Sequence, residues 1–321
     1  MPKTERSYPR EHTAFVTRRT GFQCKRTVSK ITEYFPELTA YKSATIRHLL
    51  THTSGMPDDE DDQWTAEVWK ESGTIPANDI TLRFLCESGE GPLAAPGELF
   101  EYSNPGYQLL AEIVEKVSGM RFEDYLQENI FGPAGMRDTG VHHSLRDGIP
   151  SDRFVRNMVL ENGKYILPED SKRDAGESNA EDGLNGSTNV YSTVLDMLQW
   201  DRALREETVL TREEQRMMFT AGKLNNGEDA GDEERGGYGF GWYVQSDPDL
   251  GPIVAHSGGL PGLGTWYERC VDVDRVFVFA NTRDYEDVRA YWSFAEGMIA
   301  VARDKEPEPV VGIEDLILFF I

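Results

Sequence analysis

The sequence predicts an α/β (α+β) fold, in which an antiparallel sheet flanked by helices packs against a mainly helical region. Two patterns carry this prediction. Apolar residues recur at helical spacing through the middle of the chain. The last third changes to short runs that are rich in Tyr, Phe, Val and Trp and are separated by turn residues. These runs are residues 238–244, 252–257 and 275–281, and we expect them to form three consecutive antiparallel strands.

Helices are expected on both sides of these strands in the sequence. A short helix begins after Thr45, a capping residue, and stops by Gly55. The strongest helical pattern runs from Asn104 to Gly119, because apolar residues recur there at helical spacing, with Pro105 near the start and a glycine at the end. The remaining helices are expected over residues 122–126, from about residue 192 with Leu195, Leu198 and Leu204, and over residues 286–303, covering one face of the sheet.

Composition divides the chain into three parts. The first thirty residues carry 8 of the 33 basic residues but only 2 of the 56 acidic ones. Residues 1–27 are therefore an atypical basic segment, which is either a flexible arm or the result of an incorrect gene start or frameshift. One domain is expected over residues 28–303, with a helical region at about 45–220 and a sheet with a C-terminal helix at about 236–303. Residues 304–321 are a tail, whose last ten residues are rich in Leu, Ile and Phe and form either an edge strand or an apolar tail.

Charge and composition exclude several classes of function. The net charge of −23 disfavours nucleic-acid binding, and it suits a protein kept soluble at high salt, which is the hypothesis of a halophilic source. No run of eighteen apolar residues predicts a membrane span, and no export signal is seen, so the chain as written is expected to be cytoplasmic. Three scattered cysteines predict neither a disulfide framework nor a zinc cluster, and no pattern implies a cofactor.

Two weak metal patterns are set aside. His48 and His52 lie four residues apart, but Leu49 stands where the zinc-protease pattern needs glutamate, so they are expected to be surface histidines. Residues 58–62 are all acidic but lack the spacing of a calcium loop, so a solvated loop is expected. No metal site is predicted.

Two short motifs could carry chemistry. Tyr102-Ser103-Asn104 precedes the strongest helix, and a phenol there could relay a proton if nearby cations lowered its pKa. The plainer interpretation is that Asn104 caps the helix and Tyr102 packs in a turn. His256-Ser257-Gly258 ends a predicted strand, where the glycine would let a ligand lie along the strand edge and His256 could donate a hydrogen bond. A plain end of a strand explains those glycines equally well.

In this order, the motifs and several other segments resemble the class C β-lactamase and penicillin-binding-protein family of serine hydrolases. The resemblance runs from about Val28 to Asn281. The segments that carry it are Thr45 to Pro57 (TIRHLLTHTSGMP), Tyr102 to Gly119, Ile130 to Met136 (IFGPAGM), Val190 to Met197, Tyr238 to Trp242 (YGFGW) and His256 to Gly262.

The resemblance implies a role for each motif. Tyr102 would be the general base or proton relay for a serine nucleophile, and Asn104 would bind substrate. His256, Ser257 and Gly258 would match the family's Lys-Thr-Gly strand, and histidine in place of lysine is similar to the esterase and peptidase-like branches. The implied reaction forms an acyl-enzyme from an ester, an amide or a D-amino peptide. The implied partner is a small or peptide-like substrate bound between Tyr102 and His256.

The nucleophile that the resemblance implies is missing. No serine in the 321 residues is followed by lysine at the third position, and Thr27-Val28-Ser29-Lys30 has that spacing only with threonine first. Without the serine we expect no acyl-enzyme, and without its lysine we expect Tyr102 to lack a nearby cation. Two interpretations stay open: an active hydrolase whose start was lost from the record, and a non-catalytic relative that binds peptide-like or acyl ligands.

Overall fold

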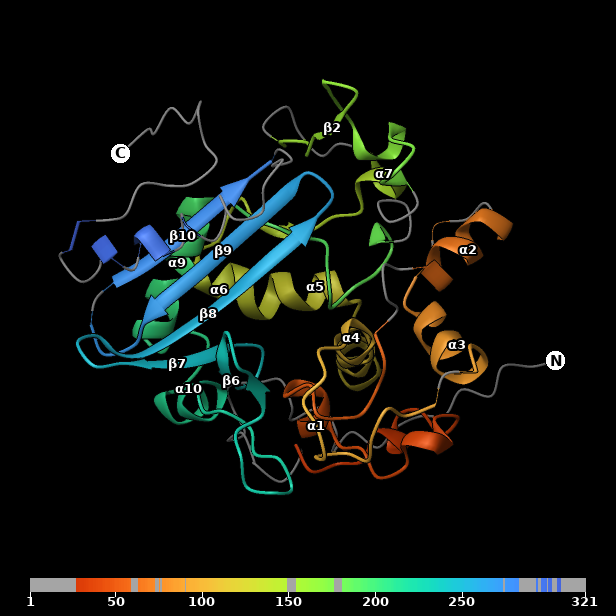
Figure 1. Ribbon diagram of the computed structural model, residues 1–321, viewed down its shortest axis with the longest axis horizontal. Helices are drawn as coiled ribbons and strands as arrows, with labels where there is room; N and C mark the ends of the chain where they lie inside the picture. Colours follow the sequence, from red (N-terminus) through yellow and green to blue (C-terminus); the bar gives the residue numbers. More distant parts are fainter. Residues whose placement is uncertain are drawn as a thin grey trace. The chain divides into compact units, whose positions relative to one another are not determined.

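The computed structural model describes residues 27–58, 63–72, 75, 77–89, 91–148, 154–175, 181–273 and 275–282, with a few single residues between 293 and 306. The chain divides into two compact units. Figure 1 labels the helices and strands and colours the chain from red at the N-terminus to blue at the C-terminus. Unit 1 consists of residues 1–150 and 179–244, and unit 2 consists of residues 151–178 and 245–321.

Unit 1 is mainly helical. Its longest helix is α4 (Asn104–Ser118), which ends at Gly119 in the left-handed conformation with φ of 70°. The helix therefore confirms the strongest pattern in the sequence. The other α-helices that the structure describes in unit 1 are α1 (Ile46–Leu50), α2 (Gln63–Ser72), α3 (Asp79–Glu87), α5 (Phe122–Leu126), α6 (Gly132–Ala134), α7 (Ser144–Asp147), α9 (Val194–Arg205) and α10 (Arg212–Met218).

The core of unit 1 gathers around α1, α3 and α4. Leu49 of α1, Phe84 of α3 and Leu109 of α4 are buried together. Residues before α1 complete this cluster, so the segment that precedes the first helix is part of the fold and not an appendage. The members that precede α1 are Ile31, Tyr34, Phe35, Leu38, Tyr41 and Ala44.

Two of the predicted helices differ in detail from the expectation. Helix α1 ends at Leu50, earlier than the predicted stop at Gly55. Helix α9 buries Leu204, but Leu195 is 72% exposed and Leu198 is 41% exposed, so two of the three leucines that predicted this helix are not in the core. The reason is that α9 turns Asp196 inward, where its carboxylate accepts bonds from the backbone N–H of Asp138 and the hydroxyl of Thr139.

Short strands complete unit 1. Strand β1 (Gly140–Val141) pairs with β4 (Val190–Tyr191), and β5 (Gly231–Asp232) pairs with β6 (Gly236–Tyr238), both antiparallel. Strand β6 pairs in turn with the first residues of β7 (Tyr243–Asp247). The single strand expected over 238–244 is therefore wrong. Between β6 and β7 the chain turns at Gly241, whose φ is 80°, and the N–H of Gly239 donates to the carbonyl of Trp242.

Unit 2 contains an antiparallel sheet of long strands, which confirms the sheet part of the predicted fold class. Strands β8 (Gly251–Leu260), β9 (Leu263–Cys270) and β10 (Arg275–Asn281) follow one another as hairpins. The runs expected at 252–257 and 275–281 fall within β8 and β10. However, β9 lies between them and was missed, because Glu268 and Arg269 interrupt its apolar pattern.

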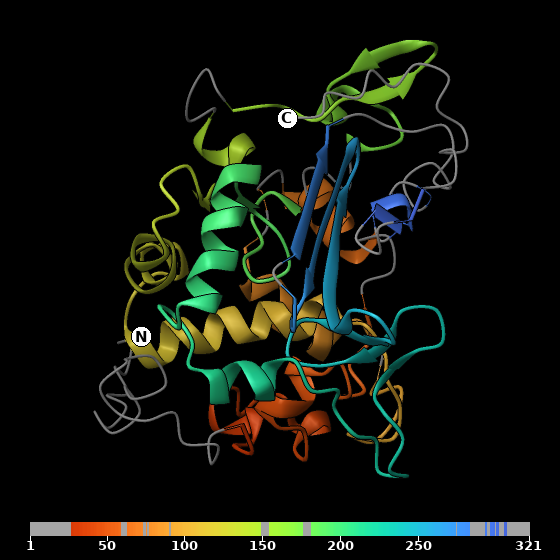
Figure 2. The same cartoon turned by 90° about the vertical axis from the view of Figure 1, so that its left-hand side faces the viewer.

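A hairpin from an earlier part of the chain joins unit 2. Strands β2 (Val159–Glu161) and β3 (Lys164–Ile166) form it, and Figure 2 shows it in light green beside the end of β10. The N–H of Met158 donates to the carbonyl of Thr282 at 3.0 Å, and the side-chain amide of Asn157 donates to the carbonyl of Pro261 at 2.5 Å. Most of the helix expected over 286–303, the basic segment up to residue 26 and the tail from 307 lie outside the described residues.

Candidate functional site

Ser103 determines how Tyr102 and Asn104 are placed. Its backbone is extended, and its hydroxyl accepts a bond from the N–H of Gly106 in the first turn of α4. The same hydroxyl donates to the carbonyl of Pro57 at 3.2 Å. The cap of α4 is therefore Ser103 and not Asn104, so the plainer interpretation of Asn104 is wrong. Ser103 is buried, whereas Tyr102 and Asn104 on either side of it are half-buried.

Asn104 is held by a carboxylate from the loop that follows α1. Its backbone N–H donates to Asp58 Oδ1 at 3.0 Å, and its side-chain Nδ2 donates to Asp58 Oδ2 at 3.3 Å. This pair of bonds fixes which end of the Asn104 amide faces Asp58. Asp58 is thus part of the candidate site and not of a solvated acidic loop, and residues 59–62 lie outside the described residues.

The ring of Tyr102 lies against a buried histidine. Its centroid is 4.1 Å from that of His52, with 32° between the two planes. The ring of Tyr238 meets Tyr102 edge-on, with centroids 6.3 Å apart. Such contacts restrict the rotation of the Tyr102 ring, so its hydroxyl has a defined position.

His52 joins the loop after α1 to the start of α4 and to β6. Its Nδ1 accepts a bond from the N–H of Ser103 at 3.1 Å, so this nitrogen carries no proton. The proton of a neutral ring is then on Nε2, which donates to the hydroxyl of Tyr238 at 3.2 Å. His52 is 1% exposed and has φ of 52°. The expectation of a surface histidine on a helix is therefore wrong, because α1 ends before this residue.

Tyrosine hydroxyls continue this network. The hydroxyl of Tyr107 on α4 donates to the carbonyl of Leu50 at 2.9 Å. A hydrogen bond also joins Tyr107 and Tyr238, and burial is the largest cause that raises the pKa of each of these two phenols. Both therefore stay protonated and hold the structure around Tyr102.

The pKa of Tyr102 is set by opposing effects. Burial raises it most, and the neighbouring phenol of Tyr243 and the carboxylate of Asp58 raise it further. The positive charge of Arg235 lowers it. The net effect raises the pKa of Tyr102 above that of an ordinary tyrosine, so the phenol stays protonated near neutral pH. The expected effect of the missing lysine stays a prediction.

The second predicted motif lies in unit 2. His256, Ser257 and Gly258 are consecutive on β8, and each pairs with a residue of β9. The Nδ1 of His256 is 2.6 Å from the carbonyl oxygen of Ser257, an acceptor, so Nδ1 carries a proton. A Cβ atom on Gly258 would lie 2.6 Å from the hydroxyl oxygen of Thr265, which explains a glycine at this place. The structure brings Tyr102 and Asn104 together within unit 1, and these three residues together within unit 2.

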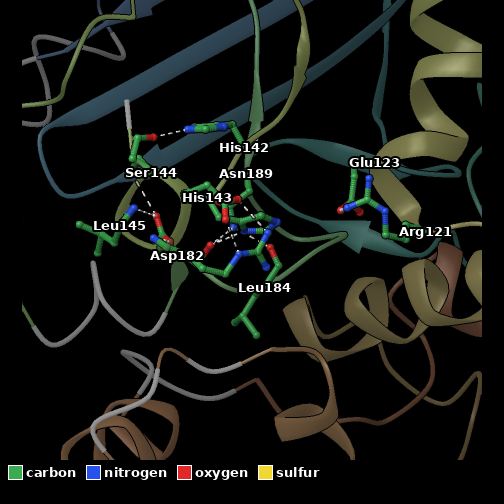
Figure 3. A network of polar contacts seen from close by, with 12 residues as sticks. Arg121, Glu123, His142, His143, Ser144, Leu145, Asp182, Leu184 and Asn189 are labelled. Carbon is green, nitrogen blue, oxygen red and sulfur yellow. Dashed lines mark hydrogen bonds and ion pairs between the residues drawn. The ribbon is translucent and has the colours of Figure 1, made fainter. Parts of the chain in front are cut away.

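A separate polar network in unit 1 contains the residue types of a Ser–His–Asp triad. Figure 3 shows how they lie. The Nδ1 of His143 contacts the backbone carbonyl of Asp182, not its carboxylate, and the hydroxyl of Ser144 donates directly to that carboxylate at 3.2 Å. The same carboxylate accepts from the N–H groups of Leu145 and Arg146. Asp182 thus caps the short helix α7, and the histidine does not stand between serine and acid as a triad requires.

Sequence reasoning missed most of the residues that surround Tyr102. Asp58 was grouped with an acidic loop, and His52 was assigned to a helix surface. Tyr238 begins the YGFGW segment and Tyr243 follows it directly. This segment contributed to the family resemblance, but the sequence assigned no role to either phenol. Arg235 has no signal of its own in the sequence, because only the turn between β5 and β6 brings it onto Tyr243.

Within the ranges that the structure describes, no three His, Cys, Asp or Glu side chains gather as a metal ion would need. Among the same residues, no helix combines the length and the apolar character that a bilayer crossing requires.

Known proteins share sequence with this chain. The family model described as Beta-lactamase matches residues 26–296. Penicillin-binding protein 4* of Bacillus subtilis (strain 168) is 34% identical over 249 residues, covering 76% of this chain and 52% of that protein. The D-alanyl-D-alanine-carboxypeptidase/endopeptidase AmpH of Escherichia coli (strain K12) is 28% identical over 236 residues, covering 69% and 54%. The chain spans about half the length of these relatives.

Solved structures share the fold. The octameric penicillin-binding protein homologue from Pyrococcus abyssi has a TM-score of 0.70 at 23% identity, covering 88% of this chain and 61% of that one. The D-amino acid amidase from Ochrobactrum anthropi SV3, complexed with D-phenylalanine, has a TM-score of 0.63 at 22% identity, covering 87% and 76%. These likenesses confirm the predicted fold class, and the match over residues 26–296 confirms the resemblance. The chain belongs to the beta-lactamase family.

Proposed function

We propose that the chain carries the ligand-binding part of a hydrolase site for an ester, an amide or a D-amino peptide bond. The proposal rests on one arrangement: Tyr102 and Asn104 flank the buried cap of α4, with the Asn104 amide oriented by Asp58. An oriented amide can bond to an amide-bearing ligand, and a positioned phenol can exchange a proton with it. His256, Ser257 and Gly258, which are consecutive on β8, are proposed as ligand-binding residues of unit 2.

The names of similar proteins support this substrate class. AmpH is named for acting on D-alanyl-D-alanine, and the amidase was solved with D-phenylalanine. Both names describe ligands that contain a D-amino acid. We therefore propose a D-amino acid amide or peptide as the ligand of this chain.

We also propose that the chain as given forms no acyl-enzyme. The supporting observation is the sequence, in which no serine is followed by lysine at the third position. The corresponding test uses nitrocefin and a p-nitrophenyl ester, with an active serine β-lactamase as positive control. We expect no burst of product and no added mass on the intact protein, and a stoichiometric acyl adduct would contradict the proposal.

Binding is tested separately from acylation, by calorimetric titration with D-phenylalanine amide. We expect the chain to bind it, and Asn104→Ala to weaken binding by about tenfold, or about 1.4 kcal/mol. Asn226→Ala, an exposed asparagine in the segment before β5, is the matched control and should leave affinity unchanged. Equal affinity of the wild type and Asn104→Ala, or no binding by either, would contradict the assignment of this site.

Reading the gene upstream in three frames for a Ser-x-x-Lys pattern separates an active parent from a non-catalytic relative.

A further inference from the structure

The segment that carries Asp58 is fixed against the residues that precede α4. Residues 51–57 are all buried. The backbone N–H of Ser103 donates to His52 Nδ1 at 3.1 Å. The hydroxyl of Ser103 donates to the carbonyl of Pro57 at 3.2 Å, one residue before Asp58. The carboxylate of Asp58 therefore meets the start of α4 from a backbone that is held in place.

Asp58 allows only one orientation of the Asn104 side-chain amide. The two oxygens of its carboxylate accept separate bonds, one from the backbone N–H of Asn104 at 3.0 Å and one from the side-chain Nδ2 at 3.3 Å. A carboxylate has no proton to donate, so the reversed amide would set its oxygen against a negatively charged oxygen. The NH2 group of Asn104 therefore faces Asp58, and the carbonyl oxygen of the same amide points away from it.

This carbonyl oxygen of Asn104 is available to a ligand. Among the described residues, no donor bonds to it. It is not sealed inside the protein either, because it does not belong to the buried polar atoms that lack a hydrogen-bond partner in the described part of the chain. The side chain thus presents an acceptor, while Asp58 occupies its donor.

An oxygen in this orientation discriminates between ligands by their hydrogen-bonding groups. An amide N–H donates to it, whereas the alkoxy oxygen of an ester faces it with no proton between the two oxygens. Asn104 is half-buried, so water still reaches the group that is left without a partner. We therefore expect a preference of about tenfold for the amide, and not the far larger factor of a sealed site.

We propose that Asp58 determines specificity by turning the Asn104 oxygen outward, so that the site selects a ligand with an amide N–H over the matching ester. The inference rests on the proposed function, and it narrows the bond types considered there to the amide and the D-amino peptide. Asp58 acts through Asn104 and is therefore a positioning residue.

The test compares D-phenylalanine amide with D-phenylalanine methyl ester by calorimetric titration at pH 6. Both ligands carry an ammonium group at this pH, so the effect of a variant's charge cancels in the ratio of the two affinities. We expect the wild type to bind the amide about tenfold more tightly than the ester. Asn104→Ala should weaken binding of the amide and leave binding of the ester unchanged, which removes the preference.

Asp58→Asn gives the sharper result, because asparagine has one acceptor oxygen where aspartate has two. That oxygen stays with the backbone N–H of Asn104, and the introduced NH2 group faces the Asn104 side chain. The Asn104 amide then turns over and presents its own NH2 to the ligand. We expect the ratio of amide to ester affinity to fall to about one, with ester binding kept or strengthened because the ester carbonyl gains a donor. A general loosening of the site would instead weaken both ligands.

The matched control is Asp249→Asn, at an exposed aspartate before β8 that bonds to Asp247 through its backbone N–H. It should keep the wild-type ratio. Equal affinity of the wild type for amide and ester, or an unchanged ratio in Asp58→Asn, would overturn the proposal. If Asn104→Ala weakens both ligands equally and the wild type shows no preference, the proposed binding site stands and the selective role of Asp58 is refuted. Failure of the wild type to bind either ligand refutes the proposed function and this inference with it.

Discussion

Glu268, on β9 of unit 2, is a carboxyl group that burial has removed from water. It is 2% exposed, and it stands opposite Ala255 on β8 and Phe277 on β10. Its Oε2 accepts a bond from the indole N–H of Trp266 at 3.3 Å, while Oε1 has no hydrogen-bond partner among the described residues. Burial raises the pKa of Glu268 to about 7. The carboxyl is therefore protonated in the folded state at a pH where it is ionised in the unfolded chain.

This difference predicts how stability changes with pH. Because the folded pKa of Glu268 is about 7 and lies above the unfolded value near 4.3, the folded state binds the extra proton between these values. The contribution of Glu268 to stability is then lost as pH rises through that window, on the order of 3 kcal/mol by pH 8. We expect Glu268→Gln to remove most of this slope, since the amide keeps an acceptor for Trp266 and carries no charge.

Urea unfolding at pH 5, 6, 7 and 8 measures the effect. The control is Glu213→Gln on α10, an exposed glutamate whose loss should leave the pH dependence as in the wild type. If the difference in unfolding free energy between wild type and Glu268→Gln is the same at pH 5 and pH 8, Glu268 is not the group responsible.

At the scale of elements, α4 was predicted well because every signal that defines it lies within its own segment of the sequence. The apolar spacing predicts a helix, Pro105 predicts its start and Gly119 predicts its end, and the structure agrees with all three. The prediction missed strand β9 because Glu268 and Arg269 are charged residues, which a count of apolar positions assigns to the surface, although both are buried in the structure. The surroundings of Tyr102 could not be predicted for a related reason. Arg235 and Asp58 act on Tyr102 only in the folded chain, and no rule of sequence spacing predicts which distant residues fold together.

The cap of α4 provides a test at this scale. Ser103→Ala removes the acceptor for Gly106 and the donor to Pro57, both in a buried place. We expect a loss of about 1–2 kcal/mol in the free energy of unfolding. Ser43→Ala, at an exposed serine before α1, should change stability by less than about 0.5 kcal/mol. The free energy of unfolding of both variants is measured with a denaturant. A loss in Ser103→Ala no larger than that in Ser43→Ala would show that the cap does not stabilise the fold.

At the scale of the whole molecule, charge is the dominant property. A net charge of −23 gives self-repulsion that opposes compaction, and dissolved salt screens it. We expect the melting temperature to rise with sodium chloride. If screening alone is responsible, most of the rise in melting temperature should occur at sodium chloride concentrations below about 1 M, because the Debye length has fallen to about 3 Å there.

The halophilic hypothesis makes a further demand. It requires a continued rise in melting temperature between 1 M and 4 M salt, beyond what screening supplies. Sucrose serves as an uncharged control, because it favours compact states without screening charge. Highest stability at low salt would refute both the screening argument and the halophilic source.

The hairpin of β2 and β3 has a consequence for synthesis. Met158 pairs with Thr282, so the two ends of that contact are separated by roughly 120 residues along the chain, a long loop to close. On a ribosome, the hairpin emerges long before its partner exists, and the long β-strands that complete unit 2 come last. During that interval the hairpin is held by its own ladder, in which three residues of β2 pair with three of β3. The order of translation, and not stability alone, therefore decides when this hairpin finds its final place.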